Sequence, residues 1–193
     1  MGTIGSHDAF RERGQSLEEG YFRSRDSQLV DKLRKVFETK VARDELKKAA
    51  GISSDEVLDR MMQLNISGQM LTAFKLFPLV EIAWADGSVD AKEVEAVING
   101  AVKHGIPRDS EVMSRLRDWL SRGPTADGRA VWKMYAAELR KSLSPDQLKT
   151  FREDLLNQAH AVAQAGGGIF NIFLTESQSE KKVIEEIRAA LTN

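Results

Sequence analysis

The chain has 193 residues, of which 28 are lysine or arginine and 29 are aspartate or glutamate, so its formal net charge is −1 at pH 7. This balance argues against a protein that binds nucleic acid over its whole surface, because such a protein carries an excess of basic side chains. The sequence contains no cysteine, which excludes disulfides, thiolate catalysis and zinc–thiolate sites and is in keeping with a cytoplasmic protein.

The spacing of apolar residues predicts helices along nearly the whole chain and no strand, and therefore an all-α helical bundle. Residues 15–37 are expected to form one exposed helix, an N-terminal arm whose apolar side chains recur at multiples of four. These side chains are Leu17, Tyr21, Leu29, Leu33 and Phe37. A single helix of this kind needs a surface to pack on. We expect that surface to belong to the rest of the chain or to a second copy, which would make a homodimer.

A short helix pair is predicted next, over residues 43–50 and 54–64, with Ser53 and Glu56 at the spacing of a capping box. Its glycine-containing turn resembles that of a DNA-binding helix–turn–helix. The second helix, however, opens with acidic residues that would repel phosphate groups. We therefore interpret the pair as a packing or partner-binding element and expect no nucleic-acid partner. Together with the arm it forms an accessory region, residues 1–64.

Residues 69–85 are apolar on every side, which predicts a helix at the centre of the bundle, and Pro78 is expected to kink or divide it. Its apolar run is interrupted by Lys75, Pro78 and Glu81, so we expect no membrane span. Further helices are predicted over residues 91–104, 110–120, around Trp132, 145–165 and up to Leu191. The best-marked helix starts are Asp90 with Glu93, Ser144 with Gln147, and Ser177 with Glu180.

Two segments of the chain follow the same pattern. Residues 83–87 and residues 163–167 are both alanine-rich helix ends that break at glycine, and a capping box and an apolar helix follow each of them. We interpret them as two helix–loop–helix hairpins that pack as a pseudo-symmetric pair. The second hairpin has a longer loop and lacks a carboxylate equivalent to Asp86.

The segment Phe77-Pro78-Leu79-Val80-Glu81-Ile82-Ala83-Trp84-Ala85-Asp86-Gly87, with Glu93 seven residues after the aspartate, resembles the tellurite-resistance protein B (TerB-like) family of bacterial proteins. The resemblance covers about residues 67–193, so a TerB-like helical domain is expected over residues 65–193. It implies a compact helical fold, a cytoplasmic setting and a role in metal or oxyanion stress. It also implies that acidic residues of the first hairpin are candidates for cation binding.

The acidic turn after residue 85 has the ligand spacing of the second half of a calcium EF-hand loop, with Asp86, Asp90 and Glu93 as the oxygen donors. The first two ligand positions of such a loop hold Ile82 and Trp84, so a complete calcium site is not expected. An open site for Mg²⁺, Ca²⁺ or Mn²⁺ is the remaining metal hypothesis. Asp86 and Glu93 would be its principal ligands and Asp90 would assist. Glu180 would join them if the two hairpins pack face to face.

The same residues also suit a purely structural role. Asp90 and Glu93 form a capping box by spacing, Gly87 suits a turn with positive φ, and the Asp86 side chain suits hydrogen bonds to backbone N–H groups inside that turn. The sequence therefore leaves the ligand hypothesis and the capping hypothesis open side by side.

No serine, lysine or tyrosine is flanked by groups that would activate it, and residues 166–168 lack the lysine and hydroxyl residue of a phosphate-binding loop. We therefore expect a protein that is not an enzyme. The leading hypothesis is a cytoplasmic protein whose weak cation binding adjusts a binding surface for a protein partner. The alternative is a metal-independent interaction module that uses the arm and the apolar loop at residues 169–174.

Overall fold

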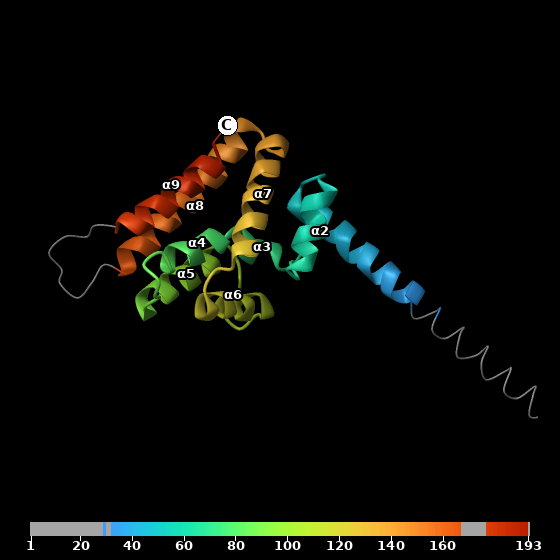
Figure 1. Cartoon of the computed structure of the whole chain (residues 1–193), viewed down its shortest axis with the longest axis horizontal. Coiled ribbons are helices and arrows are strands. Elements are labelled where there is room, and N and C mark those ends of the chain that lie inside the picture. The colour runs from blue at the N-terminus through green and yellow to red at the C-terminus, as the bar shows by residue number, and fades with distance from the viewer. Residues whose placement is uncertain (1–28, 30–31, 167–176, 193) are drawn as a thin grey trace, which may run out of the picture. The chain divides into compact units, whose positions relative to one another are not determined.

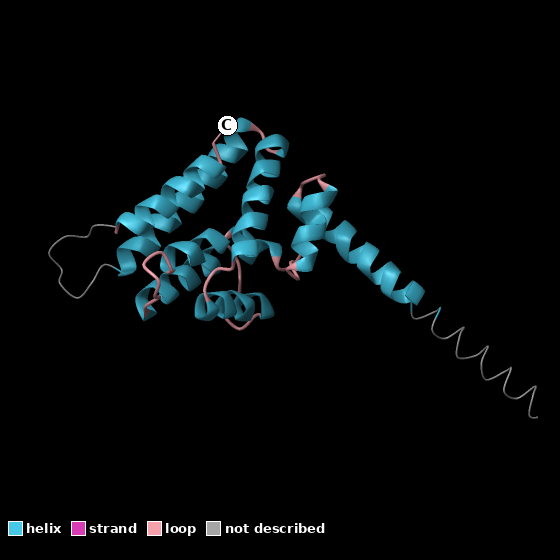
Figure 2. Ribbon diagram, viewed as in Figure 1, coloured by secondary structure: helices cyan, strands magenta, loops and turns pink. Residues whose placement is uncertain are grey.

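The computed structural model describes residues 29, 32–166 and 177–192, and these residues form helices and connecting loops without a strand (Figure 2). The prediction of an all-α helical bundle is therefore confirmed. Residues 32–50 are helical. The later helices are α2 (Asp55–Gln63), α3 (Leu71–Lys75), α4 (Phe77–Ala83), α5 (Ala91–Lys103), α6 (Glu111–Arg122), α7 (Ala126–Ser142), α8 (Pro145–Gly166) and α9 (Gln178–Ala190).

Contacts divide the chain into two compact units, Met1–Ala42 and Arg43–Asn193. Residues 43–64 fall in the second unit, where α2 packs against α7 and buries Val57, Leu58 and Met61. Most of the predicted arm helix and all of the apolar loop at residues 169–174 lie outside the described residues. No helix in the described part of the chain is long and apolar enough to cross a bilayer.

The central helix predicted over residues 69–85 is divided in two, as expected from its proline. α3 ends at Lys75, Leu76 lies between the helices, and Pro78 occupies the first turn of α4. Proline is well suited to a first turn, where its missing N–H leaves no intrahelical hydrogen bond unmade. All residues of α4 except Glu81 are buried, which confirms that this segment forms the centre of the bundle.

The core of the second unit is built around α4 and α8. α4 packs against α5, α6, α7, α8 and α9, while α8 packs against α4, α5 and α9. In Figure 1, α8 and α9 run side by side, with α4 and α5 next to them. This arrangement brings the start of α5, the end of α8 and the start of α9 to one end of the bundle. Asp90 and Glu93 lie at the start of α5, and Glu180 lies at the start of α9. The proposed pseudo-symmetry of the two hairpins stays a prediction.

Local capping signals place most helix starts correctly. Both halves of the capping box are formed at Asp90 with Glu93 and at Ser177 with Glu180. The same reciprocal bonds join Ser144 and Gln147. The predicted box at Ser53 is wrong, because Ser54 is the N-cap of α2 and its side chain accepts from the N–H of Val57. The two serines are adjacent, and the local backbone decides which one has the extended conformation that a cap requires.

Candidate functional site

The turn between α4 and α5 carries the first of the predicted ligands. The Asp86 Oδ1 atom accepts hydrogen bonds from the backbone N–H and the hydroxyl of Ser88, at 3.0 and 3.3 Å. Gly87 has φ of 94°, which an L side chain rarely adopts. Asp86 therefore closes a tight turn with one carboxylate oxygen, while its other oxygen accepts no hydrogen bond from the described residues.

Asp90 and Glu93 cap the start of α5. The Asp90 Oδ1 atom accepts from the N–H groups of Lys92 and Glu93, at 2.7 and 2.9 Å, and the Glu93 Oε2 atom accepts from the N–H of Asp90 at 2.9 Å. These three bonds satisfy backbone donors that have no partner within the helix. The predicted capping role is therefore present, and Asp90 Oδ2 and Glu93 Oε1 accept no hydrogen bond from the described residues.

The Glu93 side chain is buried, with 7% of the residue exposed. Its Oε1 atom lies against Gly166, the last residue of α8, so closely that a Cβ added to this glycine would be 2.6 Å away. The pKa of Glu93 is raised to about 7, mainly by burial; the N–H bond from Asp90 opposes the increase, and the negative charges of Asp90, Asp86 and Glu180 add to it. A proton or a cation at this carboxylate would relieve an unfavourable charge.

Glu180 lies at the start of α9 and is also buried, with 8% of the residue exposed. It accepts from the N–H of Ser177 and completes the second capping box. Its negative charge contributes to the raised pKa of Glu93. Among the described residues, however, no three histidine, cysteine, aspartate or glutamate side chains are arranged to hold a metal ion. The four-residue metal site stays a prediction.

The carboxyl group of Glu81, on α4, is a second one with an unusual environment, after that of Glu93. Sequence reasoning did not identify this environment. Burial raises its pKa to about 7, Glu186 adds to the increase, and Arg129 and Lys133 oppose it. Lys133 also forms a 2.9 Å ion pair with Glu186. Glu81 therefore interacts with charges on α7 and α9, which only tertiary packing brings to α4.

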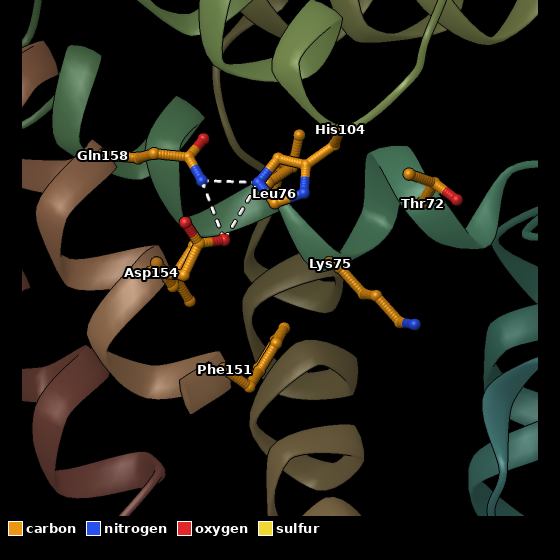
Figure 3. Close-up of a pocket in the computed structure, with 8 residues that line it drawn as sticks. Thr72, Lys75, Leu76, His104, Phe151, Asp154 and Gln158 are labelled. Carbon is orange, nitrogen blue, oxygen red and sulfur yellow. Dashed lines mark hydrogen bonds and ion pairs between the residues drawn. The ribbon is translucent and has the colours of Figure 1, made fainter. Parts of the chain in front are cut away.

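Sequence reasoning also missed a cavity of about 210 Å³ between α3, the end of α5 and α8. His104, Asp154 and Gln158 line one side of it, and Lys75 and Thr72 line another (Figure 3). The sequence signal for this cavity is weak. His104 is a single histidine at the end of the helix predicted over residues 91–104, and nothing local connects it to residues about fifty positions later.

The helical residues described in the first unit carry five exposed large apolar side chains, which we call the apolar stripe. It consists of Leu29, Leu33, Val36, Phe37 and Val41. Val36 and Phe37 are each 67% exposed. The spacing of three, four and seven residues places the stripe on one face of a helix, opposite charged residues such as Lys35.

Comparison with known proteins finds no matching family model, no matching curated protein and no matching solved structure. The TerB-like resemblance of residues 67–193 therefore remains an expectation from the sequence motif.

Proposed function

We propose that this chain is a non-catalytic, TerB-like helical protein that works by binding protein partners through the apolar stripe. The observation that supports this function is the exposure of five large apolar side chains on one face of a helix. A soluble monomer rarely leaves such a face in water, and contiguous apolar patches commonly mark sites of interaction. A metal or oxyanion stress response in the bacterial cytoplasm would be the setting that the TerB-like resemblance implies.

The free energy that burial of the apolar stripe would contribute supports the same function. Burying the side chains of Leu33 and Phe37 alone would contribute about 3–6 kcal/mol. The helix at residues 32–50 carries most of the stripe, and most of the stability of a protein helix comes from packing its apolar face against another surface. The partner is therefore expected to stabilise the helix that it binds, and a second copy of the chain is one such partner.

A photo-crosslinking experiment on the full chain tests this function. A benzophenone amino acid at position 36 is expected to form adducts with a second protein chain in cells. The Leu33→Ala, Phe37→Ala double variant should abolish those adducts. The same crosslinker at position 35, on the charged face, is the matched control and should give none. Adducts only between position 36 and residues of the same chain would refute the proposal, because the arm would then be packing on its own second unit.

A second candidate function is weak divalent-cation binding at the acidic turn, with Asp86 and Glu93 as principal ligands and Asp90 and Glu180 assisting. The specific observation in its favour is the buried Glu93 carboxylate, whose charge is disfavoured by burial and by three other carboxylates. Mg²⁺, Ca²⁺ and Mn²⁺ prefer such oxygen ligands. Each of Asp86, Asp90 and Glu93 uses one oxygen for the turn or the cap and retains the other for a cation.

Calorimetric titration of chelator-treated protein with each of the three ions tests this second function. Asp86→Asn retains the acceptor that closes the turn but loses the charge, so it should weaken binding without unfolding the protein. Asp118→Asn, at an exposed position on α6, is the control and should bind as the wild type does. A dissociation constant of about 1 mM or tighter that only Asp86→Asn weakens is expected. Equal binding by both variants, or no binding of any ion, would refute the site.

A further inference from the structure

The cavity between α3, the end of α5 and α8 is independent of both surfaces proposed above, since none of its lining residues belongs to the apolar stripe or to the acidic turn. Its floor is apolar. Leu76 and Leu155 are buried there, and the half-buried ring of Phe151 forms one wall. A cavity of about 210 Å³ with such a floor suits the hydrocarbon part of a small organic molecule.

One side of the cavity presents a hydrogen-bonded group of three side chains (Figure 3). The amide nitrogen of Gln158 contacts Nε2 of His104 and donates to Oδ2 of Asp154 at 3.3 Å. Nε2 of His104 also lies 3.2 Å from the same Oδ2 atom of Asp154, so both neighbours contact this ring nitrogen. In Figure 3, Nδ1 is on the side of the ring away from Gln158 and Asp154. The three side chains therefore interact with one another and form a polar wall of the cavity.

The Gln158 amide points its oxygen away from His104 and Asp154 (Figure 3). Its Oε1 atom is buried and has no hydrogen-bond partner among the described residues. It lies next to Gly100, where an added Cβ would be only 2.6 Å away. The amide nitrogen lies on the other side, where it donates to the Asp154 Oδ2 atom.

Lys75 supplies a positive charge at the opposite side of the cavity. Its side chain is half-buried, and burial alone lowers the pKa of its amine. No acidic side chain in the described part of the chain forms an ion pair with it. Figure 3 shows its amine directed away from Asp154, on the side where the Thr72 hydroxyl also lies. A partly desolvated ammonium without a counter-ion favours an anion from solution.

We infer that this cavity is a binding site for a small carboxylate with a short apolar body. The carboxylate would accept hydrogen bonds from the Lys75 amine and the Thr72 hydroxyl, and the apolar body would lie on Leu76 and Leu155. Both groups donate to an anionic acceptor, and the apolar floor distinguishes a carboxylate with an apolar body from inorganic anions.

Hexanoate, its neutral isostere hexanamide, and inorganic phosphate test this assignment on the full chain at pH 7. Binding is followed by NMR through the methyl groups of Leu76 and Leu155. Hexanoate is expected to shift both and to saturate, and hexanamide to bind at least about tenfold more weakly, a difference of about 1.4 kcal/mol. Phosphate should not bind saturably, since it has no apolar body. This comparison needs no substitution and therefore does not depend on the folding of a variant.

Two variants then test whether the positive charge of Lys75 binds the carboxylate. Lys75→Met keeps the length and the apolar stem of the side chain, and it should weaken hexanoate binding about tenfold while leaving hexanamide unchanged. Lys103→Met, at an exposed position on α5, is the control and should bind as the wild type does. Equal affinity for hexanoate and hexanamide in the wild type would overturn the assignment. So would phosphate binding as tight as hexanoate, or no methyl shift with hexanoate at tens of millimolar.

Discussion

Neutralising Glu93 should change how the stability of the protein depends on pH. The pKa of Glu93 rises from 4.5 to about 7 on folding, because the carboxyl group is buried beside three other carboxylates. The folded protein therefore holds this proton more tightly than the unfolded chain does. The stabilisation that results is complete below pH 4.5 and is lost as the pH rises through about 7.

This increase in the pKa of Glu93 corresponds to a change of at most about 3 kcal/mol in the free energy of unfolding. Water reaches the turn, because Asp86 and Asp90 are exposed, and its screening reduces the value. We therefore expect an effect of about 2 kcal/mol, or about 4–8 °C in Tm for a chain of this size. Glu93→Gln removes the charge and keeps an oxygen that can accept from the N–H of Asp90, so the cap should survive.

The assay is urea unfolding of the wild type and Glu93→Gln at several pH values between 4.5 and 8. The wild type should lose about 2 kcal/mol relative to Glu93→Gln across this range, with most of the change complete by pH 7.5. Glu111→Gln is the matched control, because Glu111 also lies in the first turn of a helix but is exposed. A difference between wild type and Glu93→Gln that is constant with pH would refute the reasoning. It would mean that the Glu93 carboxylate is not destabilised by its surroundings.

Four further substitutions test local features of the fold by chemical unfolding. Ser54→Ala should lower the free energy of unfolding by about 0.5–1 kcal/mol and Ser53→Ala by much less, and the opposite order would reassign the cap of α2. Tyr135→Phe should raise it by about 1 kcal/mol, because the buried hydroxyl has no partner among the described residues, and a clear loss would reveal one. Gly128→Ala should lower it by about 1–3 kcal/mol, because the new Cβ would lie 2.6 Å from Phe77 Cζ. A gain of about 1 kcal/mol instead would mean that helix propensity outweighs the clash.

The helical class and most helix boundaries could be predicted from the sequence, because they depend on interactions within a few residues. A capping box joins residues three apart, so Asp90 with Glu93 and Ser177 with Glu180 were recognisable by spacing alone. The division of the central helix at Pro78 follows from the proline ring itself. The one capping error, at Ser53, arose where two adjacent serines offer the same chemistry.

Tertiary structure decided the environment of each carboxylate and the position of the cavity. Nothing near Glu93 in sequence indicates that its free oxygen would lie against Gly166, more than seventy residues away. The charges around Glu81 likewise come from α7 and α9. The cavity combines Lys75, His104 and Asp154 from three separate segments. Desolvation and charge–charge energies depend on the burial of a group and on its distance in space from other charges. A local sequence pattern therefore predicts which groups can ionise or bind. Only the packing of the helices determines which of these groups come into contact.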